Sequence, residues 1–295
     1  MPGVVFLAIA ARCGAAEGTV PRDGFDLHYR TSGSGTPAIL LSGGPGLDVD
    51  YMAGVIEHLP PSYMSILFEQ RGTGRSRPAK VSRENMTLPL VIDDLEALRV
   101  QLKQGRLSLV GHSWGAMLAM AYAAKYPQRV DRLLLIGPGG TTSEFFAIAG
   151  DNIQSRLLPQ DLEARRYWAS AAERGTDADK AALEGLRAII PAYFFDRAKA
   201  LVFAAQLKEG SLHTDMSRHL GVDLGKTYDL RESLRTFDRP ALIVQGHQDP
   251  VPESTAEQTH RVLRSSKLIY LDKCGHFPWL EQPSEFRRIV NEFLK

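Results

Sequence analysis

A serine with a glycine two residues before it and another two residues after it lies in the first half of the chain, in Gly111-His112-Ser113-Trp114-Gly115. The spacing Gly-x-Ser-x-Gly is typical of a nucleophilic serine on a sharp turn between a strand and a helix. Glycines suit such a turn, because residues without a Cβ let the strand and the helix pass close together. The serine hydroxyl would then stand clear of the backbone, at the positive end of the helix dipole.

The sequence around this motif supports that interpretation, although a bare Gly-x-Ser-x-Gly also occurs by chance. Leu107–Val110 is a short apolar run, as expected for a buried strand, and Ala116–Lys125 is rich in Ala, Met and Leu and predicts a helix. The context therefore predicts that Ser113 is a nucleophile, and the remaining chain must supply an acid and a base.

Two residues after late predicted strands could fill these roles. Asp249 follows the apolar run Ala241–Gln245, and His276 follows Lys267–Leu271. Ligand and catalytic groups of a parallel sheet gather in loops that leave the carboxyl ends of its strands. We expect His276 to take the proton of Ser113 and later give it to the leaving group, while Asp249 holds the imidazole tautomer and stabilises its cation.

Other assignments for the acid and the base stay open at this stage. Glu253 and Asp272 are nearby substitutes for Asp249, although Glu253 would open a helix and Asp272 lies at the end of a strand. The remaining histidines are interpreted as structural or solvent-facing, and they are His28, His58, His112, His213, His219, His247 and His260.

An acyl-transfer reaction also needs donors for the oxyanion, and these are usually backbone amides. The amide of Trp114, at the start of the predicted helix, is one expected donor. The glycine-rich loop Ser42–Gly46, which follows an early strand, supplies the other, and we expect it to be the amide of Gly44. The alternative for this loop is a tight turn without a catalytic role.

The elements that must position these groups alternate along the chain. Further strands are expected at 25–31, 38–41, 64–68 and 130–136, and further helices at 88–102, 254–263 and 284–294. The first of these strands alternates in polarity like a half-buried antiparallel strand. Strands that alternate with helices predict an α/β fold with a largely parallel sheet covered on both faces.

The segment from 141 to 237 differs, because it is Ala-rich, dotted with charges and helical in spacing at 161–173 and 179–189. We therefore expect a core formed by 19–140 and 238–295, with a helical cap inserted at 141–237. A chain of 295 residues and 32.5 kDa accommodates one sizeable domain with such an insertion. Residues 1–18 would form an N-terminal extension or a signal peptide.

Charge and cysteine content argue against several classes of function. The net charge is +1 with acidic and basic residues well mixed, so the chain lacks the electrostatic footprint of a nucleic-acid-binding protein. Its two cysteines, Cys13 and Cys274, form no disulfide framework, and no His or Cys cluster has metal-ligand spacing. We expect no metal, no cofactor and no nucleic acid, and a small neutral or zwitterionic molecule as substrate.

The first residues allow two interpretations. Val4–Ala11 is apolar but too short to span a bilayer, and Gly14–Ala16 resembles a signal cleavage site, which would make the protein exported. However, no Lys or Arg precedes the apolar run. The other interpretation is a short extension or a misassigned start on a cytoplasmic protein.

From about Thr19 to Lys295 the chain resembles the α/β-hydrolase superfamily. Three motifs are similar to those of the proline iminopeptidase group of serine peptidases: Ser42–Gly46, Glu69–Ser76 and Gly111–Gly115. In that group the first motif usually begins with His and the second with Asp, so Ser42 and Glu69 depart from the pattern.

The resemblance implies a serine hydrolase that forms an acyl-enzyme on small amide or ester substrates. It favours removal of an N-terminal residue, often proline, from short peptides, with a carboxylesterase as the alternative and a non-catalytic binding protein on the same fold as a remote one. In the group, acidic cap residues hold the free amine of the substrate. The cap acids are Glu144, Glu163, Glu184, Asp196, Glu209 and Asp215, and solvated charge is the alternative for each.

Overall fold

A single eight-stranded sheet runs through the part of the chain that the computed structural model describes, residues 16–171 and 174–295. Both interpretations of the first residues concern a segment that lies mostly outside this range. The strand order is β1-β2-β4-β3-β5-β6-β7-β8. The strands are β1 (Ala16–Arg22), β2 (Phe25–Ser32), β3 (Thr36–Leu41), β4 (Tyr63–Phe68), β5 (Leu107–His112), β6 (Val130–Ile136), β7 (Ala241–Gly246) and β8 (Ser266–Leu271).

Helices connect and cover these strands. The α-helices are α1 (Ala53–Ile56), α2 (Leu88–Gln101), α3 (Trp114–Lys125), α4 (Phe145–Arg156), α5 (Pro159–Ala169), α6 (Ala178–Ile189), α7 (Arg197–Gln206), α8 (Thr214–Thr227), α9 (Glu253–Val262), α10 (Pro278–Glu281) and α11 (Pro283–Phe293). Short 3-10 helices are η1 (Val49–Met52), η2 (Pro127–Arg129), η3 (Ile190–Tyr193) and η4 (Ser233–Thr236). None of the helices in the described ranges is long and apolar enough to cross a membrane.

The sheet is parallel except at one edge. Strand β2 pairs antiparallel with both β1 and β4, and every other pairing from β4 through β8 is parallel. The predicted antiparallel strand at 25–31 is therefore confirmed. Strand β1 was not predicted, because Val20 is its one buried residue and its sequence carries no alternation of apolar and polar side chains.

Both faces of the sheet are buried. Along β6, Leu133 and Leu135 pack into a core with α2 and α3, whereas Leu134 and Ile136 pack into a second core with η1 and α11. Such strands show continuous apolar runs instead of alternation, as expected for a sheet covered on both sides. The predicted α/β fold with a mostly parallel sheet is confirmed.

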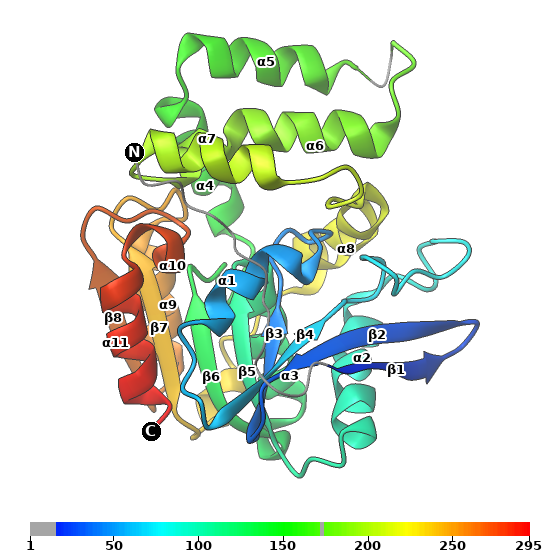
Figure 1. Cartoon of the computed structure of the whole chain (residues 1–295), viewed down its shortest axis with the longest axis vertical. Helices are drawn as coiled ribbons and strands as arrows, with labels where there is room; N and C mark the ends of the chain where they lie inside the picture. Colours follow the sequence, from blue (N-terminus) through cyan, green and yellow to red (C-terminus); the bar gives the residue numbers. More distant parts are fainter. Residues whose placement is uncertain (1–15, 172–173) are drawn as a thin grey trace.

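Helices α4 to α8 all come between β6 and β7 in the chain. Figure 1 shows α5, α6 and α7 stacked at the top of the view, above the sheet and the helices that flank it. Helices α5 and α6 pack against each other, and α7 packs against η3. Helices α5, α6 and α7 therefore form a group of their own, beyond one end of the sheet and its flanking helices.

A buried carboxylate of α2 forms ion pairs with one arginine of β1 and one of the loop after β4. Arg71, in the loop after β4, forms two hydrogen bonds with Asp94 of α2, from Nε to Oδ2 at 2.7 Å and from Nη2 to Oδ1 at 2.6 Å. Arg22 of β1 reaches the same carboxylate at 2.9 Å. The Asp94 side chain is completely buried, so these arginines compensate a charge that has lost its water.

Asp94→Ala should therefore destabilise the protein strongly, because it leaves the buried Arg71 without a carboxylate to balance its charge. We expect a loss of about 3–5 kcal/mol in the free energy of unfolding, measured by urea denaturation. The neighbouring residue Asp93 provides the control, since its ion pair with Lys125 is partly exposed. Asp93→Ala should cost about 1 kcal/mol or less, and equal losses in the two variants would contradict this account.

Candidate active site

Ser113 lies on the sharp turn between β5 and α3. Its backbone φ is 56° and its ψ is −117°, a conformation that non-glycine residues rarely adopt and that clusters at functional sites. Close backbone approach explains the second glycine of the motif: a Cβ added at Gly115 would lie 2.1 Å from the carbonyl oxygen of Leu41. The predicted order of strand, turn and helix around Ser113 is present, and the missing side chain at Gly115 lets α3 pass close to β3.

The structure brings His276 and Asp249 together. The distance from His276 Nδ1 to Asp249 Oδ2 is 2.7 Å, and both side chains are buried, at 4% and 0% exposure. Asp249 Oδ1 accepts a hydrogen bond from the amide of Val251 at 2.9 Å. One carboxylate oxygen is therefore held by the backbone while the other faces the imidazole, which fixes the orientation of His276.

The two substitutes for the acid lie elsewhere. Glu253 Oε1 is 2.5 Å from Nδ1 of His247, and Asp272 Oδ1 is 3.6 Å from Nε2 of the same ring. His247 is 37% exposed, so this group belongs to the surface. Of the three acids considered, Asp249 is the one that contacts His276.

Ser113 and His276 line one pocket of about 160 Å³ together with Gly44 and Trp114. Most of its walls are apolar. They come from α3 (Met117), from α4 (Phe145, Phe146, Ala149, Ile153), from η3 (Tyr193) and from the loop after β7 (Pro250, Val251). The helical insertion thus provides much of the wall opposite the sheet.

Tyr193 adds a polar group to this pocket. Burial raises the pKa of its phenol to about 12, and the nearby Asp249 carboxylate adds to the shift. The hydroxyl therefore stays protonated at neutral pH and can donate a hydrogen bond to a bound molecule.

Gln70 of the second motif links the glycine loop to the Ser113 turn. Its Nε2 donates to the carbonyl oxygen of Ser42 at 2.9 Å, and its Oε1 accepts from the indole Nε1 of Trp114 at 2.9 Å. The Ser42 hydroxyl closes the loop by donating to the carbonyl oxygen of Leu47 at 2.8 Å. These hydrogen bonds hold Gly44 and Trp114 near each other.

The other departure from the resembling motifs, Glu69, has a structural role. Its Oε2 accepts from the amide of Arg75 at 2.6 Å, and its Oε1 accepts from the Arg75 guanidinium at 3.0 Å. Glu69 thus folds the second motif onto itself. It does not line the pocket that contains Ser113.

None of the six cap acids, all of which lie in the described ranges, is among the residues that line this pocket. Glu184 pairs with Arg187 at 2.5 Å, Asp215 pairs with Arg218 at 3.1 Å, and Asp196 caps the start of α7. The other three are exposed, namely Glu144, Glu163 and Glu209.

Two further residues lie at the site; sequence reasoning gave the first no role beyond a structural or solvent-facing one and did not name the second. His112, interpreted as structural or solvent-facing, is buried, and its ring centroid lies 4.5 Å from that of His276. Burial lowers the pKa of His112 well below its usual value, and the neighbouring His276 adds to the shift. Tyr51 contacts His112 from η1. The place of His112 within the serine motif was a usable signal, whereas no motif surrounds Tyr51.

Known proteins agree with this architecture. A family model described as alpha/beta hydrolase fold matches residues 36–283. A probable proline iminopeptidase of Leptolyngbya boryana is 31% identical over 284 residues, covering 85% of this chain and 84% of the relative. A proline iminopeptidase of Heyndrickxia coagulans is 26% identical over 279 residues, with 90% and 93% coverage.

Solved structures share the fold. A thermophilic esterase from Thermogutta terrifontis superposes with a TM-score of 0.70 at 22% identity, covering 95% of this chain and 98% of the esterase. The chain is thus similar in sequence to proline iminopeptidases, and its fold is shared by solved esterases and solved proline iminopeptidases alike.

Asp249→Asn should lower the hydrolytic kcat/KM by about 10³- to 10⁴-fold, measured with a chromogenic ester and a chromogenic amide, because the introduced amide cannot hold the required imidazole tautomer. Glu253→Gln and Asp272→Asn serve as matched controls and should retain activity within about threefold, because both side chains are exposed and neither lines the pocket that contains Ser113 and His276. A mild effect of Asp249→Asn beside a large effect of either control would reassign the acid.

Gly137→Ala should also damage the site. Gly137 has a φ of +48°, and an added Cβ would lie 2.8 Å from His276 Nδ1 and 3.1 Å from Asp249 Oδ2. We expect kcat to fall by about 10²-fold, since misplacement of about 1 Å costs this much. Gly221→Ala is the control, because an added Cβ there meets nothing within 4 Å. Equal kcat values in the two variants would contradict the tight packing described here.

Proposed function

Because the chain belongs to the α/β-hydrolase fold family, we propose that it is a serine hydrolase that acts through an acyl-enzyme on small ester or amide substrates. The observation that carries this proposal is the buried 2.7 Å contact between His276 and Asp249, beside the pocket that His276 shares with Ser113. The strained backbone of Ser113 supports the same assignment.

The proposed reaction uses these groups in turn. His276 accepts the hydroxyl proton while Ser113 Oγ bonds to the carbonyl carbon of the substrate. The carbonyl oxygen becomes an oxyanion, and the amides of Gly44 and Trp114 stabilise it. As the intermediate collapses, His276 gives its proton to the departing alcohol or amine. Water then bonds to the acyl carbon while His276 takes its proton. The bond from that carbon to Ser113 Oγ breaks, which releases the acid, and His276 returns the proton to Oγ.

The segment 141–237 acts in this proposal as the cap that selects the acyl group. Its α4 and η3 contribute apolar and aromatic side chains to the pocket, and none of the described side chains lining that pocket is a carboxylate. A protonated substrate amine would lose its water there without a compensating charge, which is unfavourable. The lining therefore favours an uncharged, apolar acyl group, as in a carboxylester.

A proline-iminopeptidase-like aminopeptidase is the second candidate. It is favoured by relatives of that name that match 85% and 90% of this chain. This function needs an acidic anchor for the free amine, and the proposal would then require one of the cap acids to approach the pocket when substrate binds. The two candidates share the same nucleophile and differ in the substrate.

The deciding experiment compares kcat/KM for p-nitrophenyl butyrate and for proline p-nitroanilide. We expect the ester to be hydrolysed rapidly and the amide slowly, because the pocket is apolar and uncharged. Clear preference for the amide, lost when its amine is blocked, would instead assign the aminopeptidase.

Ser113→Ala is the blank for both substrates and should lower kcat by about 10⁶-fold. Ser155→Ala, at an exposed serine of α4, is the matched control and should behave like the wild type. Activity of Ser113→Ala within about tenfold of the wild type would show that Ser113 is not the nucleophile.

A further inference from the structure

A chain of hydrogen bonds joins the glycine loop to the backbone of His276. The hydroxyl of Tyr51 lies 2.5 Å from the amide nitrogen of Gly43 and 2.8 Å from Nδ1 of His112. The other ring nitrogen of His112, Nε2, lies 2.9 Å from the carbonyl oxygen of His276. Tyr51 and His112 therefore connect two parts of the site that are more than 200 residues apart in sequence.

The direction of each hydrogen bond follows from the chemistry of the end groups. A carbonyl oxygen can only accept, so Nε2 of His112 must carry the proton and donate to His276. Nδ1 of this neutral ring then accepts, and Tyr51 must donate its hydroxyl proton to it. The Gly43 amide can only donate, and it donates to the Tyr51 oxygen. Every donor and acceptor along the chain is satisfied in one way.

The side chains of His112 and Tyr51 both stay uncharged around neutral pH. Burial lowers the pKa of His112 well below its usual value, with a further contribution from His276, and burial raises the pKa of Tyr51 above its usual value. The directions of the hydrogen bonds are thus preserved around neutral pH.

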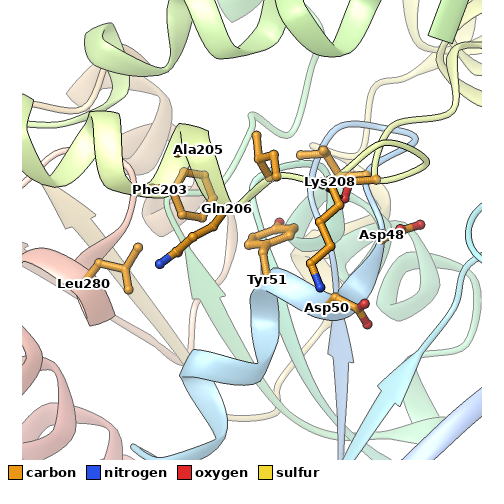
Figure 2. A pocket seen from close by; sticks show the side chains of 11 residues that line it. Asp48, Asp50, Tyr51, Phe203, Ala205, Gln206, Lys208 and Leu280 are labelled. Atoms are coloured by element: carbon orange, nitrogen blue, oxygen red, sulfur yellow. Dashed lines mark hydrogen bonds between the residues drawn. The ribbon is translucent and has the colours of Figure 1, made fainter. Parts of the chain in front are cut away.

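Aromatic packing fixes the ring of Tyr51. It stacks against Trp279 with ring centroids 6.3 Å apart, and it meets Phe277 and Phe203 edge to face at 6.3 and 6.2 Å. One side of the ring borders a second cavity of about 370 Å³. Figure 2 shows the ring in the middle of the view, lining that cavity between Phe203 on one side and Lys208 on the other. A ring held in this way presents its hydroxyl at a defined point.

The Tyr51 hydroxyl, the Ser113 side chain and the His112 ring all lie close to Gly43. A Cβ added at Gly43 would be 3.0 Å from the Tyr51 oxygen, 3.1 Å from Cβ of Ser113 and 3.3 Å from His112 Nδ1. The amide of Gly43 is engaged by Tyr51, and the next amide along the loop is that of Gly44. A shift at Gly43 would therefore move the oxyanion donor assigned to Gly44.

We propose that Tyr51 is a positioning residue that, together with His112, fixes the oxyanion loop relative to Ser113 and His276. This inference rests on the proposed function, because it assumes that Gly44 donates to an oxyanion formed on the substrate. Tyr51 does not touch the substrate in this account. Its effect is on the transition state, whose charge the loop must meet at short range.

Tyr51→Phe tests this proposal, because it removes the hydroxyl and keeps the ring. For p-nitrophenyl butyrate we expect kcat to fall about 10- to 100-fold. KM should change by less than about twofold, because a misplaced oxyanion donor weakens binding of the transition state and not of the substrate. The inhibition constant of n-butylboronic acid should rise by the same factor as kcat/KM falls, because its tetrahedral adduct on serine resembles the transition state.

Tyr122→Phe is the matched control. Tyr122 is also buried and also loses a hydroxyl hydrogen bond, to Glu96 at 2.7 Å, but it lies near the far end of α3. Its kcat and its boronic acid inhibition should match the wild type, although its melting temperature falls. Equal effects of the two Tyr→Phe variants on kcat would overturn the proposal, because they would reflect lost stability alone.

His112 gives a second test that holds even where Tyr51→Phe fails to fold. His112→Leu removes both hydrogen bonds and should lower kcat and weaken boronic acid binding. His112→Gln offers one acceptor and one donor at the side-chain tip, so it should restore most of the loss seen in His112→Leu. A Gln variant no better than the Leu variant would overturn the proposal.

Failure of the proposed function is recognised separately. In that case the wild-type protein would hydrolyse neither ester nor amide and would not bind n-butylboronic acid, and both the function and this inference would be overturned. Wild-type turnover with an unaffected, folded Tyr51→Phe variant would overturn this inference alone.

Discussion

The strained backbone at Ser113 is the constraint on which the rest of the structure depends. A residue held with positive φ costs on the order of 1–3 kcal/mol and persists only where its surroundings fix it. The Ser113 amide donates to the carbonyl oxygen of Ile136 at 3.0 Å, and its own carbonyl oxygen accepts from Ala116 at 3.0 Å. Every residue of α3 from Trp114 to Ala123 is buried. The core therefore holds the turn from both sides.

The three sequence motifs are parts of one support around that turn. The first forms the glycine loop, the third forms the turn, and Gln70 of the second bridges them through Ser42 and Trp114. Arg71 of the same motif reaches in the other direction to the buried Asp94. The Gln70 and Arg71 side chains thus serve to position loops, whereas the proposed chemistry is assigned to groups that line the pocket. Ser42, at the start of the glycine loop, also has a positioning role, because its hydroxyl donates a hydrogen bond to the carbonyl oxygen of Leu47 and so closes the loop.

Local patterns predicted the sheet and the proposed triad for a physical reason. Buried parallel strands are short apolar runs, and their carboxyl ends meet at one edge, so Asp249 and His276 could be paired from their places after two strands. Strand β1 was missed because it buries a single side chain. Tyr51 was missed because its role depends on contacts with His112 and Gly43 that no local pattern encodes. The cap acids could be named from the sequence but not placed, since helical periodicity does not give the packing of one helix on another.

The central claim is that Ser113 is a nucleophile activated by His276, and covalent labelling tests it most directly. The folded protein would be treated with a fluorophosphonate, and the modified residue would be identified by mass spectrometry of its peptides. The account predicts one label per chain, on Ser113, and none in the Ser113→Ala variant. Folded protein that takes no label, or a label on another residue, would contradict the account.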